Sequence, residues 1–181
     1  MDSSKGWLAR KPECRGDHAP SADVDPRLAG LTLTLGQDAG ALYDLGRAKS
    51  ATGDPAAALD HYGQALRLYQ TALHRGNEAA TLNDIGLVYD GLGERRRALE
   101  YYGQALPITR EVGDRAGEAV TRYNVAMIHR AQGELARAVA ELEQVVELDR
   151  RVSHTDLQSD TEMLRQVREE LLNSQRTPGS R

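Results

Sequence analysis

The sequence predicts an all-α fold, a solenoid of three helix pairs followed by a C-terminal capping helix. The chain repeats with a period of 40 residues: 39–78 and 79–118 are identical at 14 of 40 positions, and 79–118 and 119–158 at 9 of 40. Unrelated sequences share roughly two or three. The matched apolar positions fall at helical spacing. Each repeat also contains a glycine followed by an acid, which indicates a tight turn between two helices.

Composition narrows the class of protein before any motif is considered. The chain has 181 residues, 40% of them hydrophobic, one cysteine and a formal charge of −4. No run of 18 apolar residues is present, so no membrane-spanning helix is expected. A mildly acidic chain is a poor candidate for binding nucleic acid or an anionic membrane. The first residues lack the apolar stretch of a signal peptide, so we expect a cytoplasmic protein. Its basic residues are almost all arginine, which hints at a bacterial source.

The first 37 residues do not match the repeat and are expected to be largely disordered, above all 1–26 with their prolines and charges. Within them, residues 31–35 alternate leucine and threonine as a strand would, yet no partner strand is predicted. We expect these leucines to lie extended over the first helix pair. The alternative is that they are the remnant of an earlier repeat.

Residues 38–158 are interpreted as the three repeats, 39–78, 79–118 and 119–158, each of two amphipathic helices. Asp54-Pro55 is a strong helix start, because the carboxylate caps free N–H groups and the proline needs no donor. Gly113 can take a positive φ and end the preceding helix. The first helices are expected over 39–51, 77–91 and 115–131, and the second over 54–74, 94–112 and 134–151.

Small residues recur where the two helices of a pair should meet. Gly46, Gly86 and Ala126 lie on the first helices, and we expect them to face alanines at positions 58, 98 and 138 of the second. With nothing larger than a methyl group on either side, the helices of a pair can approach closely.

Residues 159–173 form a seventh amphipathic helix by pattern. Ser159 and Glu162 have the spacing of a capping box. An array of repeats needs a terminal helix, because its last pair would otherwise expose a core-like face. The apolar register is shifted from that of the earlier first helices, so we interpret this helix as a cap. Residues 174–181 are expected to be a disordered tail.

The repeat resembles the tetratricopeptide repeat. It has L-x-x-I-G-x-x-Y from Leu82 to Tyr89 and A-x-x-x-Y-x-x-A from Ala98 to Ala105. A period of 40 in place of 34 resembles a longer variant, found in spindle-orientation scaffolds and in bacterial sensor or regulator proteins. The third repeat departs from the pattern at Arg122, His129 and Leu142. The resemblance implies a right-handed solenoid whose first helices line a concave, peptide-binding groove.

The resemblance also implies which side chains point into the groove. They mix amides, carboxylates, arginines and aromatics, which suits an extended peptide better than a plain solvated helix face. We expect the amides of Asn83 and Asn124, together with Arg130, to be solvent-exposed and ready for a partner. The full set is Tyr43, Asp44, Arg47, Asn83, Asp84, Leu87, Asp90, Tyr123, Asn124, Met127 and Arg130.

Other motifs carry less weight. Cys14 and His18 could form half of a zinc site, but no second ligand pair is present. Arg15-Gly16-Asp17 is an integrin-type tripeptide that composition alone would produce by chance, and Trp7 is interpreted as an incidental aromatic. No nucleophile elbow or phosphate-binding loop occurs. We therefore expect no enzyme, no metal and no cofactor.

The sequence thus predicts a monomeric adaptor or sensor module that binds a peptide segment of another protein. The alternative is the detached or truncated C-terminal sensor part of a multidomain signalling ATPase or CHAT-type protease. An enzyme in its own right would need a polar constellation in a pocket, and the sequence shows none.

Overall fold

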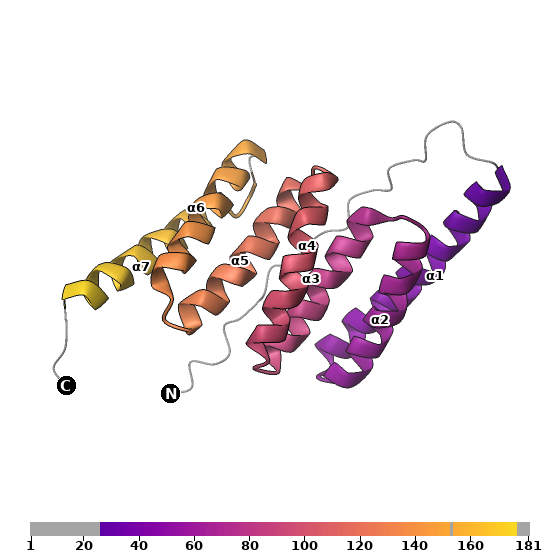
Figure 1. Cartoon of the computed structure of the whole chain (residues 1–181), viewed down its shortest axis with the longest axis horizontal. Coiled ribbons are helices and arrows are strands. Elements are labelled where there is room, and N and C mark those ends of the chain that lie inside the picture. Colours follow the sequence, from indigo (N-terminus) through magenta and orange to yellow (C-terminus); the bar gives the residue numbers. More distant parts are fainter. Residues whose placement is uncertain (1–25, 153, 177–181) are drawn as a thin grey trace. The chain divides into compact units, whose positions relative to one another are not determined.

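The computed structural model describes residues 26–152 and 154–176, and in these ranges it contains seven helices and no strand (Figure 1). The predicted all-α class is therefore confirmed. The helices are α1 (Pro26–Ala51), α2 (Pro55–Thr71), α3 (Arg75–Gly91), α4 (Arg95–Glu111), α5 (Arg115–Ala131), α6 (Leu135–Val152) and α7 (Leu157–Arg176).

The chain divides at Asp114 into two compact units. In the first, α1 pairs with α2, α3 pairs with α4, and α2 packs against α3. In the second, α5 pairs with α6, and α7 packs against α6. The helix bounds from α2 to α6 lie within three residues of those predicted from the 40-residue period.

The turns have the backbone geometry that the sequence predicts. Asp54 caps α2 by accepting a hydrogen bond from the Ala57 N–H at 3.1 Å, and a proline follows it. Gly113 has a φ of 71°, a left-handed conformation that glycine adopts without penalty. The equivalent position one repeat earlier is Leu73, which takes a φ of 58°. A leucine pays about 1–2 kcal/mol for that conformation.

Tyrosine rings explain the recurring glycines of the first helices. A Cβ atom on Gly46 would lie 2.6 Å from Cδ1 of Tyr62, and one on Gly86 would lie 2.5 Å from Cε1 of Tyr102. The ring of the pairing helix thus occupies the space that a side chain would take. The expectation that these glycines face only alanines was incomplete. The tyrosine four residues after each alanine, Tyr62 or Tyr102, comes closest to the glycine.

Helix α1 begins at Pro26, far earlier than the predicted residue 39. Residues 31–35 are helical, so the extended segment predicted there is wrong. Proline is tolerated in the first turn of a helix, and leucine is a good helix former that no partner strand holds extended. The added turns are anchored at Gly36, where a Cβ would lie 2.5 Å from Cε1 of His74. The predicted disorder of residues 1–25 lies outside the described residues.

Helix α7 begins at Leu157, two residues before its predicted start. The predicted capping box does not form. Ser159 donates to the Asp156 carbonyl at 2.8 Å, and Glu162 forms an ion pair with Arg165 at 2.6 Å. The helix continues to Arg176, into the predicted tail. Leu164 and Val167 pack in one buried cluster with Ala126, Met127, Ala138, Leu142 and Val146.

Candidate functional site

Two of the predicted groove residues, Tyr43 and Asp84, form a hydrogen bond with each other. Both are buried, and the Tyr43 hydroxyl donates to Oδ2 of Asp84 at 2.8 Å. The hydroxyl of Tyr62 lies 3.5 Å from the same oxygen. Burial, and then the negative charge of Asp84, raises the pKa of Tyr62, so this tyrosine is a neutral donor. These groups tie α1 and α2 to α3 and are part of the interior.

We expect Tyr43→Phe to destabilise the protein by about 1.5–3 kcal/mol, because it removes a hydrogen bond to a buried charged group. Urea unfolding monitored by circular dichroism measures the change. Tyr101→Phe is the matched control, since Tyr101 is only partly buried and stacks on Tyr89. Equal losses in the two variants would contradict a special role for the Tyr43–Asp84 bond.

Asn83 is only 2% exposed, so the expectation that its amide is ready for a partner is wrong. Asn83 is buried because of the position of α3 among its neighbouring helices. All residues from 81 to 86 are buried, because α3 is packed by α2 and α4 and also meets α1 at Tyr43. Six consecutive buried residues leave no open helix face over that stretch.

The accessible part of the predicted set in the first unit lies on the same two helices, α1 and α3. Asp44 and Arg47 on α1 are exposed, and Leu87 and Asp90 on α3 are half-buried. The Arg47 guanidinium lies 6.0 Å from the centre of the Tyr43 ring. Burial raises the pKa of Asp90, and the nearby Arg95 offsets part of that rise.

In the second unit the predicted groove residues are mostly engaged. Asn124 and Met127 are 5% and 4% exposed, and Tyr123 is half-buried. Arg130 donates to both carboxylate oxygens of Glu170 on α7, at 2.5 and 3.1 Å. Arg130 was expected to bind a carboxylate of a partner, but a carboxylate of the chain's own cap helix occupies it.

Sequence reasoning missed an ionic cluster around the buried Glu78 at the start of α3. Glu78 is 5% exposed and accepts from Arg75 at 2.5 Å and from Gln70 at 3.1 Å. The other arm of Arg75 reaches Glu111 on α4 at 2.9 Å. The signal was present, because Arg75 and Glu78 are identical one period later, at 115 and 118. The cluster links the ends of α2, α3 and α4, which is a structural role.

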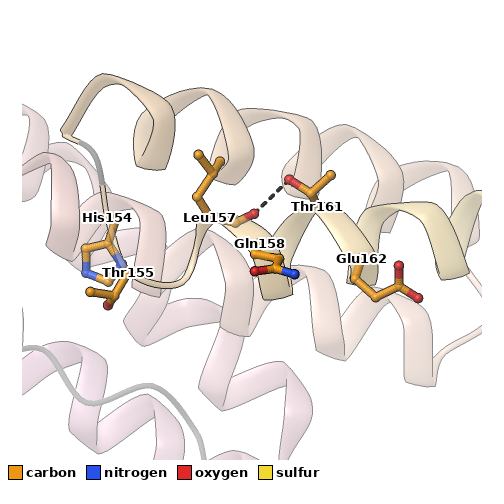
Figure 2. Close-up of a pocket in the computed structure, with 6 residues that line it drawn as sticks. All are labelled: His154, Thr155, Leu157, Gln158, Thr161 and Glu162. Carbon is orange, nitrogen blue, oxygen red and sulfur yellow. Dashed lines mark hydrogen bonds between the residues drawn. The ribbon is translucent and has the colours of Figure 1, made fainter.

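A shallow hollow lies at the connection between α6 and α7 (Figure 2). There the Thr161 hydroxyl donates to the Leu157 carbonyl at 2.7 Å, and Nδ1 of His154 accepts from the Asp156 N–H at 3.3 Å. The hollow is lined by His154, Thr155, Leu157, Gln158, Thr161 and Glu162.

Residues 26–152 and 154–176 offer neither a metal site nor a membrane-spanning helix. No group of three His, Cys, Asp or Glu side chains there is arranged to hold a metal ion. None of the helices in those ranges is both long and apolar enough to span a membrane. Cys14, His18, the Arg15-Gly16-Asp17 tripeptide and Trp7 lie outside the described residues.

Comparison with known proteins agrees with the repeat geometry. A family model described as tetratricopeptide repeat matches residues 37–111 and, one period on, residues 77–151. Together the two matches cover well over half of the chain. No curated protein matches the sequence.

Proposed function

Because the chain belongs to the tetratricopeptide repeat family, we propose that it is an adaptor or sensor module that binds a peptide segment of a partner protein. Repeats of this family generally mediate protein–protein interaction, and their all-helical fold is typically non-catalytic. We further propose that the binding surface on the first unit lies on α1 and α3. This surface comprises Asp44, Arg47, Leu87 and Asp90.

One observation carries this choice of surface. The bond between Tyr43 and Asp84 holds α1 beside α3, and Arg47 and Leu87 follow these two residues by four and three positions. Residues at that spacing lie on the same side of a helix, one turn further along. An exposed guanidinium on α1 and a half-buried leucine on α3 thus lie one turn beyond the hydrogen bond that joins the two helices.

The chemistry of this surface suggests its ligand. Arg47 offers donors for a carboxylate, in a geometry that favours two parallel hydrogen bonds. Leu87 offers apolar contact surface, and Asp44 and Asp90 can accept from backbone N–H groups or basic side chains. A peptide with one acidic residue near one apolar residue fits this arrangement.

We expect Arg47→Glu to weaken peptide binding by roughly 10- to 100-fold, because it removes charge-assisted hydrogen bonds worth about 1.5–3 kcal/mol. Peptides would be selected from a random displayed library on the full chain and then titrated by fluorescence anisotropy. The melting temperature should change little, since Arg47 is exposed and the interaction lost within the fold is its contact with the Tyr43 ring.

The matched control is Arg67→Glu, the same change at an exposed position on α2. It should leave the affinity within about twofold of wild type. Failure to select any binding peptide, or equal affinities in the two variants, would contradict the proposed surface.

A further inference from the structure

Helix α1 carries a helix-packing face that is covered in the next two repeats. Leu45 is 48% exposed, whereas the same repeat position is 3% exposed at Ile85 and 8% at Val125. The pattern extends to its neighbours, because Ala41 and Ala48 are exposed. Their counterparts one and two periods on are all buried: Thr81, Val88, Thr121 and Ile128.

The second repeat shows what such a face packs against. Ile85 and Val88 of α3 lie in one buried cluster with Tyr62, Ala65 and Tyr69 of α2. In the second repeat the face therefore receives a helix that lies alongside it. Helix α1 presents the same face with its leucine half open to solvent.

Helix α1 is also longer than the other two first helices, since it extends back to Pro26. Leu31, in this extension, is 56% exposed. Among the exposed residues from Leu31 onward, one subset follows alternating intervals of three and four, the spacing of a coiled-coil seam. We name this seam the α1 stripe; its members are Leu31, Thr34, Asp38, Ala41, Leu45 and Ala48.

We propose that the α1 stripe is a homodimer interface, in which a second copy of this chain packs its own α1 antiparallel across a two-fold axis. This goes beyond peptide binding and departs from the monomer predicted from the sequence. In a two-fold interface the same patch is used by both copies, so it must be complementary to itself.

The α1 stripe meets that condition. In an antiparallel pair, Leu31 faces the partner subunit's Ala48, and Leu45 faces the partner subunit's Thr34. Each large side chain thus lies opposite a small one, which lets two helices interdigitate. The third layer places Asp38 opposite the partner subunit's Ala41, so the two carboxylates are not directly opposed.

Asp38 is expected to fix the alignment of the two α1 helices in the dimer. A single polar residue in a helix–helix seam fixes the register at a cost in stability. The stripe from 31 to 48 is also short, about 27 Å at 1.5 Å per residue. We therefore expect a dimer that forms in the micromolar range and has one alignment.

Analytical ultracentrifugation of the full chain from about 1 to 200 μM tests the proposal. The expected result is a monomer–dimer equilibrium that closes at two copies. Leu45→Glu should raise the dissociation constant at least tenfold, because it places a charge in the seam. Asp38→Leu should lower the dissociation constant of the dimer at least tenfold. A misfolded variant would not give this tighter association together with an assembly that stops at the dimer.

The matched control is Leu92→Glu, the same change at a leucine that is 46% exposed at the end of α3. It should leave the dimer unchanged. Three results would overturn the proposal: a monomer over the whole range, assembly beyond two copies, which indicates head-to-tail contact, or a dimer insensitive to Leu45→Glu.

Discussion

Removal of residues 157–181 is expected to destabilise the second unit by roughly 3–6 kcal/mol. The deletion takes away Leu164 and Val167, which are 7% and 0% exposed, and burying a side chain of this kind is worth about 1.5–3 kcal/mol. It also uncovers Leu142 and Val146 of α6 and leaves Arg130 without Glu170. In repeat proteins stability is approximately a sum of units and interfaces, so losing one interface is felt by the whole array.

Thermal melting and size-exclusion chromatography measure this effect. The truncated chain should melt at a lower temperature, or associate more strongly than the full chain through its exposed apolar face. Val167→Asp in the full chain should reproduce most of the loss, whereas Gln166→Asp, on the exposed side of α7, should not. A truncated chain with the same oligomeric state and melting temperature as the full chain would contradict the covering role of α7.

Gly86→Ala is expected to cost about 3 kcal/mol, the upper end of the range for overpacking a core. The new Cβ would lie 2.5 Å from Cε1 of Tyr102, whose side chain is fully buried and has no room to withdraw. Gly103→Ala is the control, because nothing lies within 4 Å of a Cβ there. In a helix interior that exchange should be neutral or stabilise by up to about 1 kcal/mol.

The third repeat suggests a rescue of Gly86→Ala. At the equivalent positions it has Ala126 and Leu142, both fully buried in one cluster. Adding Tyr102→Leu should therefore recover part of the loss, since the shorter side chain makes room for the methyl group. The two changes should be non-additive in urea unfolding. Additive losses would show that the ring and the glycine are not coupled.

Most of the secondary structure could be predicted from the sequence, because it depends on local signals. The 40-residue period located helices α2 to α6 to within three residues, and the turn glycines and the Asp54 cap have the predicted geometry. Prediction failed at both ends, where no repeat was available for comparison. There alternating leucines suggested a strand, and a serine within α7 was interpreted as its cap.

The candidate site was less predictable. The repeat positions assigned to the groove assume that each first helix keeps one face in solvent. For Asp44 and Arg47 on α1 this holds, because no earlier repeat precedes them among the described residues. For Asn83 and Asp84 it fails, because α3 is packed by α2 and α4 and contacts α1.

The sequence by itself thus determined the repeat, the helices and the residues at which the chain turns. Only the tertiary structure decided which polar side chains are available to a partner. Helix formation and turn geometry depend on neighbours within a few residues, which the sequence displays directly. Exposure depends on packing from elements far away in the chain: Tyr43 contacts Asp84, and Arg130 contacts Glu170, across 40 or more residues. These long-range pairs turn residues suited to binding a peptide into residues that hold the repeats together.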